Sequence, residues 1–171
     1  MTLPFFHFNR VAAFVAGPAI APPAAVKRSV PKAAVATLPN VEADERAAAK
    51  GLAAKVIAQI RADLPQLLVV AVVDTLTGKD EASFTSQPSF DPHLAASFNA
   101  EIIKQKKRAL RAFHLEDEQI EDIIISTTSH YHIIKAINNG QKFIYVAVLE
   151  HTTSLGFVRE VLRRHSLSLV A

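Results

Sequence analysis

Four basic residues at helical spacing in the middle of the chain are the clearest candidates for binding chemistry. Lys104, Lys107, Arg108 and Arg111 follow the pattern i, i+3, i+4, i+7, so they share one side of a helix. That side is suited to docking the acidic surface of a partner protein. A solvated helix face explains the same pattern, with Arg111 placed near the negative end of the helix dipole. The sequence leaves both interpretations open.

Two histidines two residues apart raise the question of a metal site. His130 and His132 would share one face of a strand, and His151 would have to be the third ligand. No cysteine or carboxylate is placed to complete that set, so we predict exposed hairpin histidines and no metal. The hydroxyl run at residues 126–129 lacks the setting of a nucleophile, and we expect it to bond turn backbone.

Several motifs that would indicate an enzyme are missing from the sequence. There is no phosphate-binding glycine-rich loop, no dinucleotide fingerprint and no zinc-protease pattern. The chain has no cysteine, which excludes disulfides and thiolate catalysis and fits a reducing compartment. We therefore predict a cytoplasmic protein that is not an enzyme, with no catalytic residue and no cofactor.

The positive charge of the chain is concentrated at its N-terminus. The whole chain has 19 basic and 16 acidic residues. Residues 1–39 contain four of the basic residues, no acidic residue and six of the nine prolines. The remainder, with 15 basic and 16 acidic residues, is nearly neutral, so the high isoelectric point does not indicate a nucleic-acid-binding domain.

We predict that residues 1–39 form a disordered basic tail, because each proline removes a backbone donor and fixes φ. A secretion signal is an alternative, since an apolar run follows Arg10. Gly17 and Pro18 interrupt that run, so we also predict no stable membrane insertion of this segment. Weak contact with an anionic membrane stays open.

Residues 40–171 alternate between helical and strand patterns and form the predicted domain. Asn40 caps a helix that Pro65 ends. Asp91 and Ser154 cap two later helices, and the Asn-Gly pair at residues 139–140 predicts a hairpin turn. The predicted elements are a helix at 40–64, strands at 67–73 and 81–85, a helix at 92–113, strands at 123–127, 131–137 and 143–149, and a helix after Ser154.

This order predicts an α+β fold, a five-stranded antiparallel sheet with helices on both faces. The strand at 67–73 is continuous and β-branched, which indicates a central position. The middle helix has an apolar side that the spacing assigns to Leu94, Phe98, Ile102, Ile103, Leu110 and Phe113.

Three segments in this order carry a resemblance to the roadblock (dynein light chain) family, including its bacterial gliding-motility regulators. They are Val-Val-Asp at 72–74 with Gly78, the strand meander with its Asn-Gly turn, and Ser-Leu-Gly-Phe-Val-Arg at 154–159 leading to Leu-Arg-Arg at 162–164. The last segment is the most specific. The resemblance covers residues 40–165.

The resemblance implies a dimer, most simply a homodimer, that serves as a platform for a small Ras-like GTPase or another scaffold protein. In this family the long middle helix packs against its mate and the next strand pairs across the dimer axis. Carried over, this places Ile103, Leu110, Ile123, Ile125 and Thr127 at the interface. The basic stripe of the middle helix would bind the partner, and Arg108 or Arg111 could stabilise charge in GTP hydrolysis.

A second interpretation is a ligand-sensing or general protein-interaction module, because the same arrangement resembles profilin-like sensor domains. A sensor needs a concave pocket with converging polar groups. Tyr131, His132 and Lys135 are the cluster that the sequence offers for it.

Overall fold

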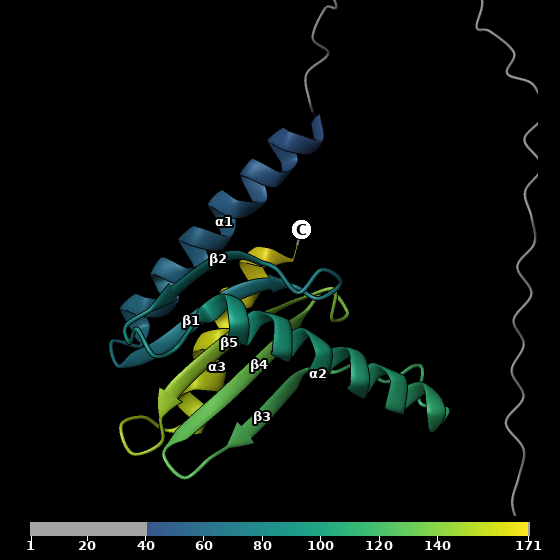
Figure 1. The fold of residues 1–171 in the computed structure, drawn as a ribbon. Helices are drawn as coiled ribbons and strands as arrows, with labels where there is room; N and C mark the ends of the chain where they lie inside the picture. The colour runs from purple at the N-terminus through teal and green to yellow at the C-terminus, as the bar shows by residue number, and fades with distance from the viewer. Residues whose placement is uncertain (1–40, 171) are drawn as a thin grey trace, which may run out of the picture. The chain divides into compact units, whose positions relative to one another are not determined.

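The fold is a five-stranded antiparallel sheet with helices on both faces, as predicted (Figure 1). The computed structural model describes residues 41–170, with side chains from Glu45 onward. The predicted tail at residues 1–39 therefore lies outside the described residues. The elements are α1 (Val41–Asp63), β1 (Leu67–Asp74), β2 (Asp80–Thr85), α2 (Pro92–Ala112), β3 (Asp122–Ser126), β4 (His130–Ile137), β5 (Lys142–Leu149), α3 (Leu155–Ser166) and a short 3-10 turn, η1 (Leu167–Leu169).

The strand order is β2-β1-β5-β4-β3, so β1 and β5 lie near the middle of the sheet and β2 and β3 form its edges. Strand β1 pairs with β2 on one side and with β5 on the other. Its residues from Leu67 to Val73 are all buried. A strand covered on both faces reads as a continuous apolar run, which is why this position could be predicted.

Helices α1 and α3 pack on one face of the sheet. Their buried stripes include Val56 and Ile60 of α1 and Val158 and Leu162 of α3, which share a core with the inward side chains of β1, β4 and β5. These positions follow helical spacing, so each helix presents one apolar side to the sheet. The face is closed by two helices lying side by side.

Helix α2 alone covers part of the opposite face. The core on this side contains Ala96, Ala100 and Ile103 of α2 together with Val73 and Phe143 of the sheet. Helix α2 contacts β1 and β2, and its C-terminal half extends past the sheet (Figure 1). The two faces of the sheet are thus covered very differently.

Both predicted helix caps that fall among the described side chains are confirmed. The Asp91 carboxylate accepts hydrogen bonds from the backbone amides of His93 at 2.9 Å and Leu94 at 3.3 Å. The Ser154 hydroxyl accepts one from the amide of Phe157 at 3.3 Å. Each cap satisfies a backbone N–H that has no partner inside its helix, which stabilises such a helix by about 1 kcal/mol.

Only part of the predicted apolar side of α2 faces the sheet, namely Ile103 and, partly buried, Ile102. The large side chains of Leu94, Phe98 and Phe113 are 55%, 65% and 68% exposed. The buried side instead consists of Ala96, Asn99, Ala100 and Ile103. Small side chains allow the helix backbone to lie close to the sheet. The spacing of the large residues therefore predicted an apolar side of α2, but it did not predict which side of α2 packs on the sheet.

Candidate functional site

The four residues of the predicted basic stripe lie along one side of α2, but their surroundings differ. The Lys104 amine is 2.8 Å from Glu101, and the Arg108 guanidinium is 3.8 Å from the same carboxylate. Arg111 is exposed. The Lys107 amine donates to the backbone carbonyls of Asn139, at 2.6 Å, and Gly140, at 3.1 Å. Lys107 therefore has a structural role in holding the β4–β5 turn.

The contact at Lys107 is tight. Burial and the charge of Arg111 lower the pKa of the Lys107 amine. Gly140 has a φ of 68°, and a Cβ added there would meet the Lys107 side chain at 2.8 Å. The Asn-Gly turn was thus predicted correctly, while its connection to α2 was not visible in the sequence.

An exposed apolar stripe runs along another side of α2. It comprises Leu94, Phe98, the partly buried Ile102 and Phe113, and we call it the α2 stripe. Successive members from Leu94 to Ile102 are four residues apart, which keeps them on one side of the helix. The predicted interface residue Ile103 is fully buried in the protomer core, so that assignment was wrong. Leu110 is partly buried.

Strand β3 provides a second exposed apolar surface next to α2. Ile123 packs against the core on the α2 face, and Ile125, two residues on, lies on the same face and is 38% exposed. The outer edge of β3 has no partner strand among residues 41–170. Thr127 follows the strand, and its hydroxyl bonds the backbone of His130, as expected for hydroxyls in this turn.

A groove of about 640 Å³ joins the end of α2 to the edge strand. Its lining includes Leu110, Ile120 and Ile123, with Lys106 and Arg159 at its margin. The first carboxylate of β3, on Asp122, is held by the Lys135 amine at 3.2 Å and by two nitrogens of Arg159 at 2.8 and 2.9 Å. These ion pairs tie the start of the edge strand to β4 and α3.

Phe90, His130, His132 and Tyr145 form a cluster on the α2 face of the sheet. The rings of His130 and His132 are 6.0 Å apart, so they share one strand face as predicted. The His132 ring stacks on Tyr145 and its Nδ1 is 2.8 Å from the Tyr145 hydroxyl. Burial raises the pKa of Tyr145 to about 12. Burial first, and then the neighbouring His130, lower the pKa of His132.

The cluster proposed for a sensor does not converge. Tyr131 packs on the α1 and α3 side and donates to Glu150, and Lys135 binds Asp122 and approaches α3. His132 lies on the opposite face, beside Tyr145. In the described part of the chain, no three histidine, cysteine or acidic side chains gather where they could hold a metal ion.

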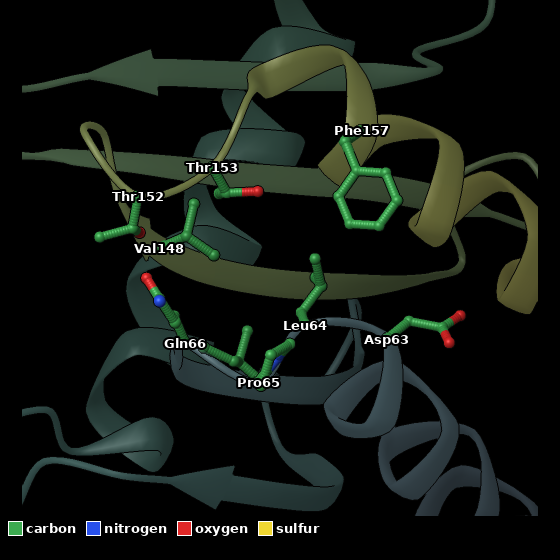
Figure 2. Close-up of a pocket in the computed structure, with 9 residues that line it drawn as sticks. Asp63, Leu64, Pro65, Gln66, Val148, Thr152, Thr153 and Phe157 are labelled. Carbon is green, nitrogen blue, oxygen red and sulfur yellow. The ribbon is translucent and has the colours of Figure 1, made fainter.

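A small pocket lies between the end of α1, the start of β1 and the turn into α3 (Figure 2). Its volume is about 200 Å³, and Leu64, Val148 and Phe157 line it. The Thr153 hydroxyl is directed into it, whereas the Asp63 carboxylate points away and is bound by His165 at 2.8 Å. The pocket presents no nucleophile with a neighbouring base.

No helix within residues 41–170 is long and apolar enough to cross a membrane.

Comparison with known proteins identifies solved structures with a similar fold but no matching sequence family. No family model matches the chain, and no curated protein matches it. Among solved structures, MglB of Myxococcus xanthus is similar with a TM-score of 0.58 and 16% identity over 74% of this chain and 87% of that one. The gliding protein MglB of Thermus thermophilus gives a TM-score of 0.57 and 11% identity over 69% and 87%.

A roadblock/LC7 domain from Streptomyces avermitilis is similar with a TM-score of 0.55 and 9% identity over 70% of this chain and 92% of that one. At these identities the likeness concerns the fold. The predicted resemblance is confirmed at that level: the described domain is roadblock-like and is similar in structure to the gliding-motility protein MglB.

Proposed function

We propose that this chain is a non-enzymatic, cytoplasmic scaffold that forms a homodimer and binds a small Ras-like GTPase. The observation that supports it best is the combination of a roadblock-like fold with an unpartnered apolar stripe on α2 beside a free sheet edge. Its basis is the family resemblance, which implies a dimeric GTPase platform. We further propose that residues 40–171 act as the folded domain and residues 1–39 as a separate tail.

The spacing of the α2 stripe supports a symmetric contact between two copies. Two α2 helices crossing antiparallel about a two-fold axis would place Leu94 opposite Phe113 and Phe98 opposite Ala109 of the second copy. Ile102 would lie opposite Gln105. A two-fold interface must be self-complementary in this way. Each large side chain of one α2 helix would then contact an uncharged side chain of the other. The β3 edges would lie beside the same contact.

The dimer can be tested with one charge on the stripe. In the full-length chain, Phe98→Glu should give a monomer by sedimentation velocity where the unchanged chain gives a dimer, because the carboxylate would be buried without a partner. Leu76→Glu is the matched control, since Leu76 is 82% exposed in the β1–β2 turn. A dimer that survives Phe98→Glu would overturn this interface.

The GTPase is assigned to the basic side of α2, away from the α2 stripe. Arg111 is exposed there, Lys104 and Arg108 share the Glu101 carboxylate, and Lys107 holds the β4–β5 turn. Exposed cations on a helix attract an acidic surface and accelerate its association. The binding would act by favouring one arrangement of the switch segments of the GTPase.

The partner can be captured with the immobilised full-length chain and a lysate of the source cell, loaded with GDP or a non-hydrolysable GTP analogue. We expect mass spectrometry to find a small GTPase retained preferentially with one nucleotide. The triple variant Lys104→Gln, Arg108→Gln, Arg111→Gln should lose it, whereas Lys50→Gln with Lys55→Gln on α1 should keep it. A retained GTPase on the triple variant would exclude this docking side, and no GTPase with either nucleotide would exclude the proposed partner.

A further inference from the structure

His130 and His132 lie at the border of the proposed dimer surface. On β4 they face the same side as Ile125, which is the register partner of His132 on β3. The Phe90 ring packs edge-on against His130 at 5.6 Å, and Phe90 directly precedes Asp91, the N-cap of α2. The two imidazoles therefore lie beside Ile125 of the exposed β3 surface and beside the segment that leads into α2.

Among the side chains that the structure describes, no carboxylate pairs with either imidazole, and the surrounding elements explain why. Strand β3 presents Ile125 and β5 presents Tyr145, whose hydroxyl contacts His132 Nδ1 and the Asn99 side chain of α2. The nearest acidic residues along the chain are engaged elsewhere. Asp91 caps α2, and Glu150 accepts from Tyr131 on the other face of the sheet.

A third histidine, His93 near the start of α2, does not belong to the cluster of His130 and His132. His93 Nδ1 is 2.5 Å from the Asp80 carboxylate, which already supplies a counter-charge. Protonation of His130 and His132 would therefore place two positive charges 6.0 Å apart, ring to ring, without a compensating anion among the described contacts. At an exposed surface water solvates such charges, but at an apolar interface they lose that solvation.

We propose that His130 and His132 make the dimer dissociate as the pH falls below about 6, so that assembly requires both imidazoles to be neutral. This inference rests on the proposed homodimer and names a way in which it is regulated. The half-burial of His132 and its contact with Tyr145 fix the ring in the surface, so it cannot turn away from a second copy when it gains a proton. His130 adds a second charge of the same sign.

The expected size follows from proton linkage. A histidine with an ordinary pKa near 6.5 that must be neutral in the dimer weakens association by about tenfold for each pH unit below that value. Between pH 7.5 and 5.5 each imidazole that must be neutral thus raises the dissociation constant by up to about tenfold, and a homodimer contains four of them, two from each copy, so the upper limit is about 10,000-fold. The low pKa of His132 makes its own share the smaller one.

The test is sedimentation equilibrium of the full-length chain at pH 7.5 and 5.5 and constant ionic strength. The unchanged chain should dissociate at pH 5.5. The double variant His130→Gln, His132→Gln should keep the same dissociation constant at both pH values, since glutamine retains hydrogen bonding without titrating. His151→Gln, which removes an exposed histidine outside the α2 stripe and β3, should dissociate in acid as the unchanged chain does.

Lysine at residue 130 provides an independent check, because it carries the charge permanently. His130→Lys should weaken the dimer already at pH 7.5. A dimer at pH 7.5 that is equally stable at pH 5.5 overturns the switch and leaves the proposed dimer intact. The absence of a dimer at both pH values overturns both. Dissociation that coincides with loss of the far-ultraviolet circular dichroism signal also overturns the switch, because unfolding would then be its cause.

Discussion

The two faces of the sheet use apolar residues for different purposes. On one face, α1 and α3 completely bury large side chains such as Ile60 and Leu162. On the other, α2 packs through two alanines, Asn99 and Ile103 and leaves Leu94 and Phe98 largely in solvent. Equal hydrophobicity in the sequence therefore serves the stability of the protomer on one face, and on the other it forms the surface that we propose for association.

The largest difference between the two faces should appear in how much a substitution on each face lowers the free energy of unfolding. Leu162→Ala removes a fully buried side chain and should lower the free energy of unfolding by about 2–5 kcal/mol. Phe98→Ala removes a larger side chain from solvent, and in a monomeric background it should change that free energy by less than about 0.5 kcal/mol. Urea unfolding at low protein concentration measures both, and equal losses would mean that α2 is packed like α3.

A smaller effect is expected from a buried polar side chain of α2 that lies against the sheet. Asn99 is buried and its side chain bonds the Tyr145 hydroxyl, which also contacts His132. Asn99→Ala should cost about 1–2 kcal/mol, at the low end for a buried polar group, because Tyr145 keeps one partner. Thermal unfolding with Ser97→Ala as an exposed control on the same helix measures this loss, and no loss would show that burial of α2 alone holds this face.

Local chemistry made most of the fold predictable. The caps at Asp91 and Ser154 and the Asn-Gly turn depend on residues within a few positions of one another. The central strand was recognised because burial on both faces requires a continuous apolar run. Even the shared face of His130 and His132 follows from strand alternation.

The features that were missed depend on distance in the sequence or on a choice between two surfaces. The Lys107 amine donates a hydrogen bond to a turn 32 residues away, so the basic stripe predicted from the sequence contains one lysine with a structural role. Ile103 and Leu94 both belong to the apolar part of α2, and periodicity does not say which one the sheet covers. The signal was present in the small residues Ala96 and Ala100, whose spacing marks the side that approaches the sheet.

The smallest predicted effect concerns the pH dependence of α2 docking, and it sharpens the contrast with the histidine pair on the sheet. The hydrogen bond to Asp80, and then the charge of that carboxylate, raise the pKa of His93. A raised pKa in the folded state means that this pair stabilises the protein fully below the unfolded value of about 6.5. The contribution is lost as the pH rises through the folded pKa.

His93→Gln should therefore lower stability by a few tenths of a kcal/mol at pH 5.5, a small value because the His93 side chain is 73% exposed. Above pH 8 the variant and the unchanged chain should unfold alike. Chemical denaturation at the two pH values measures the difference. The sign is opposite to that of His130 and His132, because acid strengthens a histidine that faces a carboxylate and weakens an apolar contact between copies. A variant that loses more stability at pH 8 than at pH 5.5 would show that Asp80 is not the counter-charge of His93.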